Sequence, residues 1–211
     1  MLLSEYAKAK SNEKVLDLGC GNGAIPLLLA SRDKGRTIVG LEIQEKVAEM
    51  ARRSVMLNGA EDKIQICCGD IKDAENLFQG ESFDVITSNP PYMREEAGIH
   101  NTGDAKCIAR HEMLCTFDDI AKAARRLLRV NGRFYLVHRP HRLADIFFGL
   151  RENGLEPKRM RLVHPYGDKE PNLVLLEAVK GGRPYLKVEP PLIIYSKPGE
   201  YTEEVRSLYY D

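Results

Sequence analysis

The amino-acid sequence predicts an α/β fold in which a mostly parallel β-sheet is covered by helices on both faces. Short apolar runs alternate with amphipathic stretches along the chain, as in strands joined by helical crossovers. A glycine-rich loop, DLGCGNG at residues 17–23, lies between the first apolar run and the first amphipathic stretch. The 211 residues, of which 43% are hydrophobic, are enough for one large α/β domain with a sizeable core.

The elements of the first half follow one another closely. A helix is expected to stop at Asn58-Gly59, because glycine readily adopts the left-handed conformation that ends many helices. The predicted elements are a strand at Lys14–Leu18, a helix at Ala24–Arg32, a strand at Thr37–Leu41, a helix from about Gln44 to Leu57, and strands at Lys63–Cys67 and Phe83–Thr87.

The second half begins with a polar stretch, Met93–Cys115, whose length indicates a functional or mobile connection. Thr116 and Asp119 then resemble a capping box that opens a helix. The expected elements are a helix to Val130, a strand at Arg133–Val137 after an Asn-Gly turn, a helix at Leu143–Asn153 closed by Gly154, and a terminal strand pair at Met160–His164 and Leu173–Val179. We expect residues 1–180 to form the domain and residues 181–211 an extended tail packed on its surface.

The overall charge is balanced, with 31 basic and 31 acidic residues. A strong, non-specific nucleic-acid binder is usually basic overall, so the composition counts against that class. The apolar runs are too short to span a bilayer and the N-terminus lacks a signal-peptide pattern, so we expect a cytoplasmic protein without a membrane partner. The five cysteines include no CxxC pair, and we expect neither disulfides nor a metal site.

Positive charge is nevertheless concentrated in three clusters. Basic clusters bind phosphate in some proteins and form a solvated surface in more of them, so both interpretations stay open for each cluster. The first cluster is Lys122, Arg125, Arg126 and Arg129, the second is His138, Arg139, His141 and Arg142, and the third is Lys158, Arg159 and Arg161.

The glycine-rich loop has the character of a ligand-binding turn. Gly19, Gly21 and Gly23 follow a strand and open a helix, where glycine lets the backbone turn sharply and approach a ligand closely. The spacing is GxGxG and differs from the GxGxxG of dinucleotide-binding domains. Asp17 leads the loop and is placed for a positively charged ligand, such as the ammonium and sulfonium groups of S-adenosylmethionine (SAM).

Acidic residues also end the next two predicted strands. Glu42 ends the second strand, where a carboxylate can accept hydrogen bonds from both hydroxyls of a ribose. Asp70 follows the third strand and is placed to accept from an adenine amine. Because ligands of open α/β sheets bind at the carboxyl edge, three acidic residues at successive strand ends predict SAM as cofactor.

The tetrapeptide Asn89-Pro90-Pro91-Tyr92 follows the fourth strand at the same edge. Its prolines fix the backbone, and Pro90 keeps Asn89 out of the helical region. The Asn89 side-chain oxygen and the Pro90 carbonyl can accept both hydrogens of one NH2 group and so orient its nitrogen toward a methyl donor. Tyr92 offers an aromatic face for a planar base or amide. We predict that these four residues carry the chemistry, with a rigid turn around a core aromatic as the alternative.

With these residues placed, the sequence resembles the class I SAM-dependent methyltransferases whose NPPY motif modifies amino groups. More narrowly, from Val15 to about Lys180, it resembles the bacterial tRNA1(Val) adenine-N6 methyltransferase family. The segments 108–112, IARHE, and 132–140, GRFYLVHRP, support the narrower resemblance.

The resemblance implies a seven-stranded Rossmann-like sheet with a terminal antiparallel strand, SAM as the donor, and a tRNA adenosine near the anticodon as the substrate. It implies a cofactor site and an acceptor site that share Asn89, with Pro90, Pro91 and Tyr92 holding the base. Relatives usually carry a further N-terminal segment that helps to cover the cofactor, which this sequence does not show. The expected cofactor residues are Asp17, Gly19, Gly21, Glu42, Ile43, Asp70, Ile71 and Asn89.

Other functions remain compatible with the same motifs. A glutamine side-chain amide fits the NPPY site as well as adenine does, so a protein glutamine methyltransferase is one alternative. An rRNA guanine-amine methyltransferase is another, and a SAM-binding module without turnover is a third. Arg110 and His111 either contact substrate or cap a neighbouring element, and the sequence favours neither.

Overall fold

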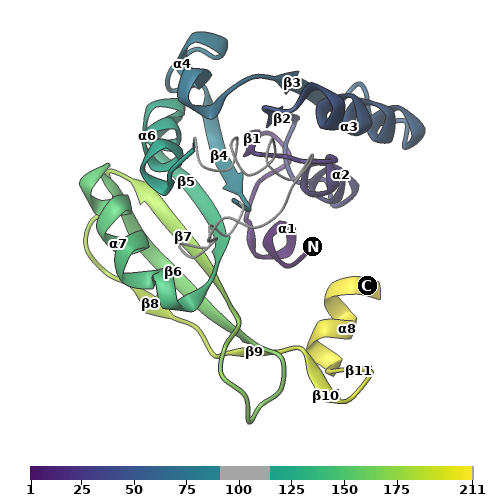
Figure 1. The fold of residues 1–211 in the computed structure, drawn as a ribbon, viewed down its shortest axis with the longest axis vertical. Coiled ribbons are helices and arrows are strands. Elements are labelled where there is room, and N and C mark those ends of the chain that lie inside the picture. The colour runs from purple at the N-terminus through teal and green to yellow at the C-terminus, as the bar shows by residue number, and fades with distance from the viewer. Residues whose placement is uncertain (91–114, 211) are drawn as a thin grey trace, which may run out of the picture.

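The structure, a computed structural model, describes residues 1–90 and 115–210 (Figure 1). Within these residues, nine strands form one sheet in the order β3-β2-β1-β4-β5-β7-β6-β8, with β9 pairing with β6. The seven long strands are β1 (Lys14–Leu18), β2 (Thr37–Glu42), β3 (Ile64–Cys68), β4 (Phe83–Ser88), β5 (Leu128–His138), β6 (Leu155–His164) and β7 (Leu173–Lys180).

Strands β1 to β5 are parallel to their neighbours within that group. Strand β7 is antiparallel to both β5 and β6. The prediction of about seven mostly parallel strands with a terminal antiparallel strand is therefore confirmed. Two short strands, β8 (Lys187–Val188) and β9 (Leu192–Ile193), extend the sheet by pairing in parallel with β6.

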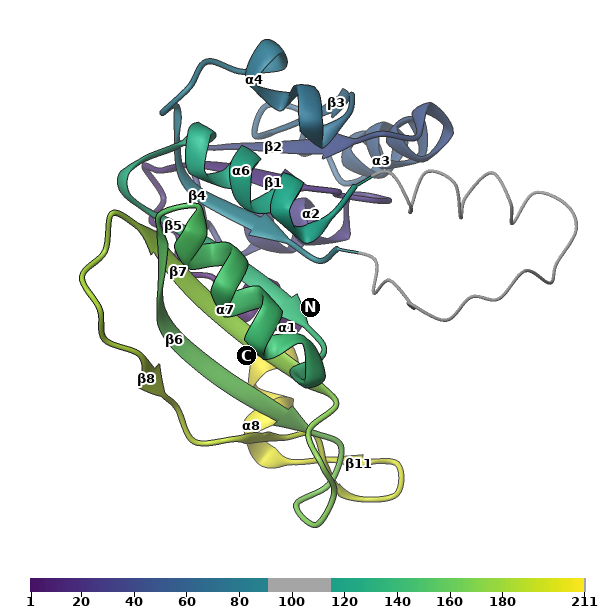
Figure 2. The ribbon, with the colours of Figure 1, turned by 60° about the vertical axis from the view of Figure 1, so that its left-hand side comes forward.

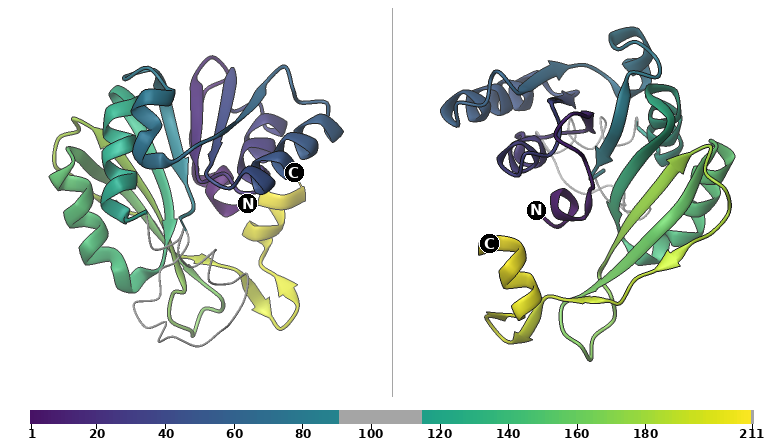
Figure 3. Two further views of the ribbon diagram at one scale, coloured as in Figure 1. Left: turned by 45° about the horizontal axis from the view of Figure 1, so that its top comes forward. Right: turned by 180° about the vertical axis from the view of Figure 1, so that it is seen from behind.

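Helices cover both faces of the sheet, as Figure 3 shows. No helix in residues 1–90 and 115–210 has the length and apolarity that a membrane crossing needs. On one face lie α1 (Leu2–Tyr6), α2 (Ala24–Ser31) and α3 (Glu45–Leu57), and on the other lie α4 (Ala74–Leu77), α6 (Phe117–Leu127) and α7 (Leu143–Glu152). Short 3-10 turns, η1 (Ile71–Asp73) and η2 (Pro140–Arg142), precede α4 and α7.

The core consists of one apolar layer on each face, because successive side chains of a strand point to opposite sides. On β1, Leu16 and Leu18 belong to the layer beneath α6 and α7. Val15 belongs to the layer beneath α1, α2 and α3. Asp17 has the same parity as Val15 and therefore lies on the α2 face, which determines its place in the site described below.

The boundary between α6 and β5 differs from the expectation. The capping box of Thr116 and Asp119 is present and opens α6, but the helix ends at Leu127 and not at Val130. Leu128 is already extended, is fully buried, and pairs with Phe83 of β4. Asn131 then has a left-handed φ of 63°, and the register shifts before pairing resumes at Arg133. Tertiary pairing thus overrides a local pattern that continues the helical period.

The C-terminal residues are only partly extended, whereas the sequence predicts an extended tail. After β9 they form a hairpin of β10 (Tyr195–Lys197) and β11 (Glu200–Tyr201) and a helix, α8 (Glu203–Tyr210). The Thr202 hydroxyl accepts from the Val205 amide at 3.4 Å and so caps the helix. Figure 2 shows β8 running beside β6 at the edge of the sheet.

Candidate functional site

Two cavities border the loops at the carboxyl ends of the parallel strands. The first has a volume of about 530 Å³ and the second about 490 Å³. Gly19 and Asn89 line both of them, so the cavities adjoin where the glycine loop approaches the end of β4. The first is also lined by Glu42, Ile43, Gln44, Asp70, Ile71, Pro90, Cys115, Thr116, Phe117, Ile120, His138 and Arg142, and the second by Met1, Leu2, Leu3, Gly21, Asn22, Val137 and Leu173.

The glycine loop has a conformation that side chains rarely permit. Gly19 and Gly21 have φ angles of 73° and 54°, in the left-handed region that glycine adopts without strain. The Gly19 amide donates to the Leu41 carbonyl at 2.9 Å, which ties the loop to β2. A Cβ atom built on either glycine would meet no atom within 4 Å. The loop therefore presents bare backbone to open space.

Asp17 lies beneath the loop and is fully buried. Its Oδ1 accepts a hydrogen bond from Thr87 Oγ1 at 2.6 Å, which joins β1 to β4. Its Oδ2 is buried without a hydrogen-bond partner among the described residues. Burial raises the pKa of Asp17 to about 7, while the hydrogen bond from Thr87 lowers it. The N-terminal ammonium of Met1 lowers it as well, and a further cationic group above the loop would act in the same direction. Asp17 is absent from the lining of the two cavities, so it acts from below the loop.

Glu42 performs two tasks at the end of β2. It is buried with 7% of its surface exposed and yet lines the first cavity. Its Oε2 accepts from the Gly21 amide at 3.0 Å and its Oε1 from the Gln44 amide at 3.0 Å. Each carboxylate oxygen can accept more than one hydrogen bond, so capacity for ligand hydroxyls remains. The carboxylate therefore holds the glycine loop and faces the cavity at once.

Asp70, Ile43 and Ile71 line the first cavity together with Glu42. Asp70 caps η1, because its Oδ1 accepts from the Lys72 amide at 2.9 Å. Ile43 and Ile71 follow the two acidic residues and line the same cavity. Glu42, Ile43, Asp70 and Ile71 thus line one cavity, and their binding of a cofactor stays a prediction. Two apolar side chains beside two carboxylates form a wall suited to a nucleoside, which is planar and apolar on its faces and polar at its edges.

Asn89 and Pro90 directly follow β4, where Asn89 lines both cavities and Pro90 lines the first. Asn89 is exposed and Pro90 is buried. The preceding residue fixes their position, because Ser88 Oγ donates to the Leu18 carbonyl of β1 at 2.9 Å. Pro91 and Tyr92, the other two residues of the tetrapeptide, lie outside the described residues. So do Arg110, His111 and most of the polar stretch that begins at Met93.

His138 and Arg142 are cavity residues that the sequence analysis assigned to a basic cluster and not to the site. His138 ends β5, and its Nδ1 accepts from the Arg139 amide at 2.8 Å, so a neutral ring carries its proton on Nε2. Burial lowers the pKa of His138 and favours that neutral form. Arg142 Nε donates to Asp145 at 2.9 Å. The sequence does indicate this position, because residues 138–142 follow a predicted parallel strand at the carboxyl edge of the sheet, where ligands of such sheets bind.

The first basic cluster lies away from the cavities. Lys122 pairs with Asp118 at 2.6 Å, Arg126 pairs with Glu75, and Arg129 pairs with Asp84 at 2.9 Å. Arg126 and Arg129 stand at the end of α6 and the start of β5, which is the edge opposite the site. Their pairing favours the interpretation of a solvated surface.

The third basic cluster has structural contacts. Arg159 pairs with Glu177 at 2.8 Å and Glu189 at 3.3 Å, and its guanidinium stands 4.4 Å from the centre of the Tyr6 ring. Arg161 pairs with Glu204 and donates to the Pro190 carbonyl at 2.9 Å. These contacts fasten α1 and the C-terminal residues to β6. Of the three clusters, the second is the one that borders either of these two cavities.

Solved structures with the same fold are methyltransferases of several kinds. A predicted O-methyltransferase from Agrobacterium tumefaciens superposes with a TM-score of 0.79 at 24% identity, covering 98% of this chain and 93% of that one. The geranyl diphosphate C-methyltransferase of Streptomyces coelicolor A3(2), solved with S-adenosyl-L-homocysteine, superposes with a TM-score of 0.64 at 14% identity, covering 85% and 78%. These similarities establish the fold and leave the acceptor atom open.

Sequence comparisons are more specific. A family described as a methyltransferase domain matches residues 9–153. The tRNA1(Val) (adenine(37)-N6)-methyltransferases of two Porphyromonas gingivalis strains are 34% identical over 77% of this chain and 33% identical over 82% of it. The matched regions span 64% and 68% of the lengths of those enzymes. The enzyme of Aeromonas salmonicida strain A449 is 31% identical over 96% of this chain and 83% of its own length. The chain therefore belongs to the methyltransferase domain family and, within it, to the family of the bacterial tRNA1(Val) (adenine(37)-N6)-methyltransferases.

Proposed function

We propose that this protein is a SAM-dependent N-methyltransferase that methylates the exocyclic amine of an adenine in tRNA, near the anticodon. The observation that carries the proposal is the position of Asn89 and Pro90. Asn89 lines both the cavity with the nucleoside-type wall and the second cavity beside the glycine loop, and Pro90 lines the first of them. The similarity to the tRNA1(Val) enzymes supports adenine as the acceptor and tRNA as its carrier.

The residues present fit SAM as the cofactor. Glu42 would accept from the ribose hydroxyls, Asp70 from the adenine amine, and Ile43 and Ile71 would pack on the adenine faces. Gly19 and Gly21 leave open the space that a bound ligand would fill. The orphaned Oδ2 of Asp17 gives the fit an independent support, because a cationic ligand above the loop would compensate a buried carboxylate. When bound, SAM supplies an electrophilic methyl group on a sulfonium centre.

The protein's own residues would then position the acceptor. The Asn89 side-chain oxygen and the Pro90 carbonyl accept the two hydrogens of the adenine NH2, which directs the nitrogen lone pair away from them. Conjugation with the ring makes that lone pair a poor nucleophile. Hydrogen bonds to two acceptors favour the pyramidal nitrogen and the positive charge that develops on it. The proton leaves to water after transfer, so the site needs no strong base. Pro91 and Tyr92 complete the proposed catalytic tetrapeptide.

The RNA backbone is proposed to approach over η2. This turn and the two residues before it carry the second basic cluster, which consists of His138, Arg139, His141 and Arg142, and two of its members line the first cavity. A cationic rim beside the acceptor site attracts phosphates that flank the target nucleotide. We propose that residues 1–180 form the methyltransferase domain, that residues 181–211 pack on it, and that the protein acts on tRNA in the cytoplasm.

A transfer assay with three acceptors tests the proposal. Protein and radiolabelled SAM are incubated with total tRNA, with ribosomal RNA and with a protein extract, and label is counted in each. We expect label in tRNA. Label in the protein extract alone would instead identify a glutamine-amide acceptor, and label in ribosomal RNA alone a guanine-amine acceptor. SAM binding without transfer to any acceptor would identify a module without turnover.

A further inference from the structure

The wall of the second cavity includes a helix that cannot stand alone. Met1, Leu2 and Leu3 line this cavity together with Gly19, Gly21 and Asn89. They belong to α1 and its first flanking residue, and α1 is only five residues long. A helix of that length is far too short to be stable in water by itself. The shape of the cavity next to the glycine loop therefore depends on the tertiary contacts that hold α1.

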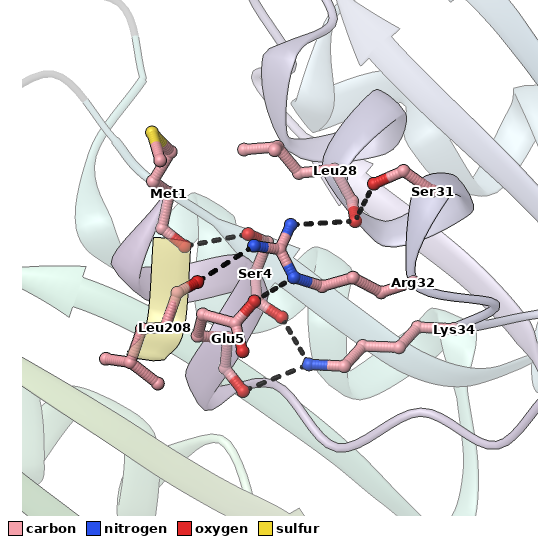
Figure 4. A network of polar contacts seen from close by, with 8 residues as sticks. All are labelled: Met1, Ser4, Glu5, Leu28, Ser31, Arg32, Lys34 and Leu208. Carbon is pink, nitrogen blue, oxygen red and sulfur yellow. Dashed lines mark hydrogen bonds and ion pairs between the residues drawn. The ribbon is translucent and has the colours of Figure 1, made fainter. Parts of the chain in front are cut away.

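Two cations in the turn after α2 provide such contacts, as Figure 4 shows. Lys34 Nζ donates to the Ser4 carbonyl at 2.7 Å and to the Glu5 carbonyl at 3.0 Å. These carbonyls lie in the last turn of α1, whose terminal carbonyls lack helical partners. A cation in this position also interacts favourably with the negative end of the helix dipole. Lys34 thus acts as the C-terminal cap of α1.

Arg32 joins three helices at once (Figure 4). Its Nη1 donates to the Leu28 carbonyl of α2 at 3.4 Å, and its Nη2 donates to the Leu208 carbonyl of α8 at 3.1 Å. Its Nε forms an ion pair with Glu5 of α1. About a quarter of its side chain is exposed, so these contacts lie partly out of solvent. A guanidinium suits this position because its planar fork directs several donors at fixed angles.

The terminal helix α8 is docked in the same place. Val205 is fully buried, and Leu208 packs against the core layer that also contains Leu3 and Leu29. Glu204 pairs with Arg161 of β6. Figure 3 shows α8 and α1 close together, with both chain termini on the α1 side of the sheet. Helix α8 is therefore linked to α1 through Arg32 and through the apolar layer that they share.

We propose that Arg32 is a positioning residue that couples the docking of α8 to the binding of SAM. It holds α1, which lines the second cavity, and it ties α8 to α1. SAM binding and α8 docking therefore stabilise one another, because coupling between two sites is reciprocal. The inference rests on the proposed function only in taking SAM as the ligand of the glycine loop.

The test compares Arg32→Gln with Arg206→Gln in the full chain. Arg206 lies on the same terminal helix and is exposed, so its substitution matches the loss of charge without breaking the junction. SAM affinity is measured by titration calorimetry, and hydrogen exchange of residues 203–208 is followed with and without SAM. We expect R32Q to weaken SAM binding by roughly five- to tenfold and R206Q by less than about twofold. SAM should slow exchange in α8 of the wild type and of R206Q, and much less in R32Q.

Kinetics separate positioning from general damage. R32Q should raise the KM for SAM and leave kcat at saturating SAM nearly unchanged, because Arg32 touches no reacting group. If R32Q does not fold, Arg32→Lys can replace it, because lysine retains the positive charge but lacks the several donors of the guanidinium. R32K should then show a smaller increase in the KM for SAM. The coupling would be overturned if folded R32Q bound SAM as tightly as the wild type. It would also be overturned if SAM did not change hydrogen exchange in α8 of the wild type. A wild type that binds no SAM would instead overturn the proposed function.

Discussion

Thr87 Oγ1 donates a hydrogen bond of 2.6 Å to the Oδ1 atom of Asp17, and both side chains are fully buried. This bond joins the two central parallel strands directly beneath the glycine loop. It satisfies one oxygen of a carboxylate whose other oxygen has no partner in the described residues. Asp17 is therefore held in place and left with charge to offer to a ligand above it.

SAM affinity should depend on pH through Asp17. Burial raises its pKa to about 7, so the carboxyl is largely protonated below that pH in the free protein. A cationic ligand prefers the ionised form, and its affinity should therefore fall by about tenfold per pH unit once the pH is well below 7. Calorimetric titration of SAM from about pH 6 to 8 measures this. Asp17→Asn should bind SAM weakly and with little pH dependence. An equally steep slope in D17N would assign the titration to another group.

The stability of the folded protein should also depend on the ionisation of Asp17. It should fall as the pH rises, whereas the affinity for SAM should rise. In the unfolded chain Asp17 releases its proton near its ordinary pKa of about 3.9, whereas in the folded chain it retains it to about pH 7. Its contribution to the free energy of unfolding is therefore fully present below about pH 4 and is lost as the pH rises through about 7. Urea unfolding across this range should show a smaller decline in D17N than in the wild type.

Removing the Glu42 carboxylate should affect the loop and the ligand together. The Glu42 carboxylate accepts from the backbone amides of both Gly21 and Gln44. In Glu42→Gln, the side-chain NH2 group would replace one of these acceptors and leave one of the two backbone amides unpaired. Leaving a buried donor unpaired should lower the free energy of unfolding by about 1–3 kcal/mol, and losing a charged acceptor for the ribose hydroxyls should weaken SAM binding by roughly 5- to 150-fold. Glu45→Gln is the matched control, because Glu45 is an exposed residue of α3 that pairs with Arg52. Equal SAM affinity in E42Q and E45Q would remove Glu42 from the cofactor site.

Replacement of basic residues should affect RNA binding only on the site edge. Arg139→Ala and Arg142→Ala should weaken tRNA binding and reduce its salt dependence by roughly one phosphate contact each, with the slope of log K against log salt falling by about 0.7–0.9. Arg126→Ala and Arg129→Ala should leave tRNA affinity unchanged, because these residues pair with Glu75 and Asp84 at the opposite edge. Filter binding at several salt concentrations distinguishes the pairs, and equal losses in all four variants would contradict the proposed RNA path.

Loss of the α6 cap should cost stability. The Thr116 hydroxyl accepts from the Asp119 amide at 3.2 Å, and Asp119 Oδ2 accepts from the Thr116 amide at 2.8 Å. Thr116→Ala should lower the free energy of unfolding by about 1 kcal/mol, as at other N-caps. Ser31→Ala is a suitable control, because its hydroxyl donates to a carbonyl at the end of α2 and caps no helix start. Chemical denaturation measures both, and an unchanged T116A would show that packing alone holds this end of α6.

The sequence predicts those features that follow from local patterns. The bounds of β1 agree at both ends, and Glu42, Asp70 and Asn89 converge because the carboxyl ends of parallel strands share one edge. The end of α6 could not be predicted, because Leu128 continues the apolar helical pattern. It is the pairing of Leu128 with Phe83 of β4 that ends the helix and begins β5. The contact of Arg32 with Leu208 spans 176 residues, and α8 forms where the buried Val205 docks. Such features depend on tertiary packing, which no local pattern contains.

The most direct test of the proposed chemistry is a nucleoside digest of tRNA methylated by the wild type and by Asn89→Ala. Unmodified tRNA is incubated with labelled SAM, digested and separated by chromatography, while SAM binding is measured on the same two preparations. We predict labelled N6-methyladenosine from the wild type and none from N89A, which should keep most of its SAM affinity because Glu42 and Asp70 still hold the cofactor. Label in any other nucleoside, or N6-methyladenosine at wild-type levels from N89A, would contradict the role assigned to this site.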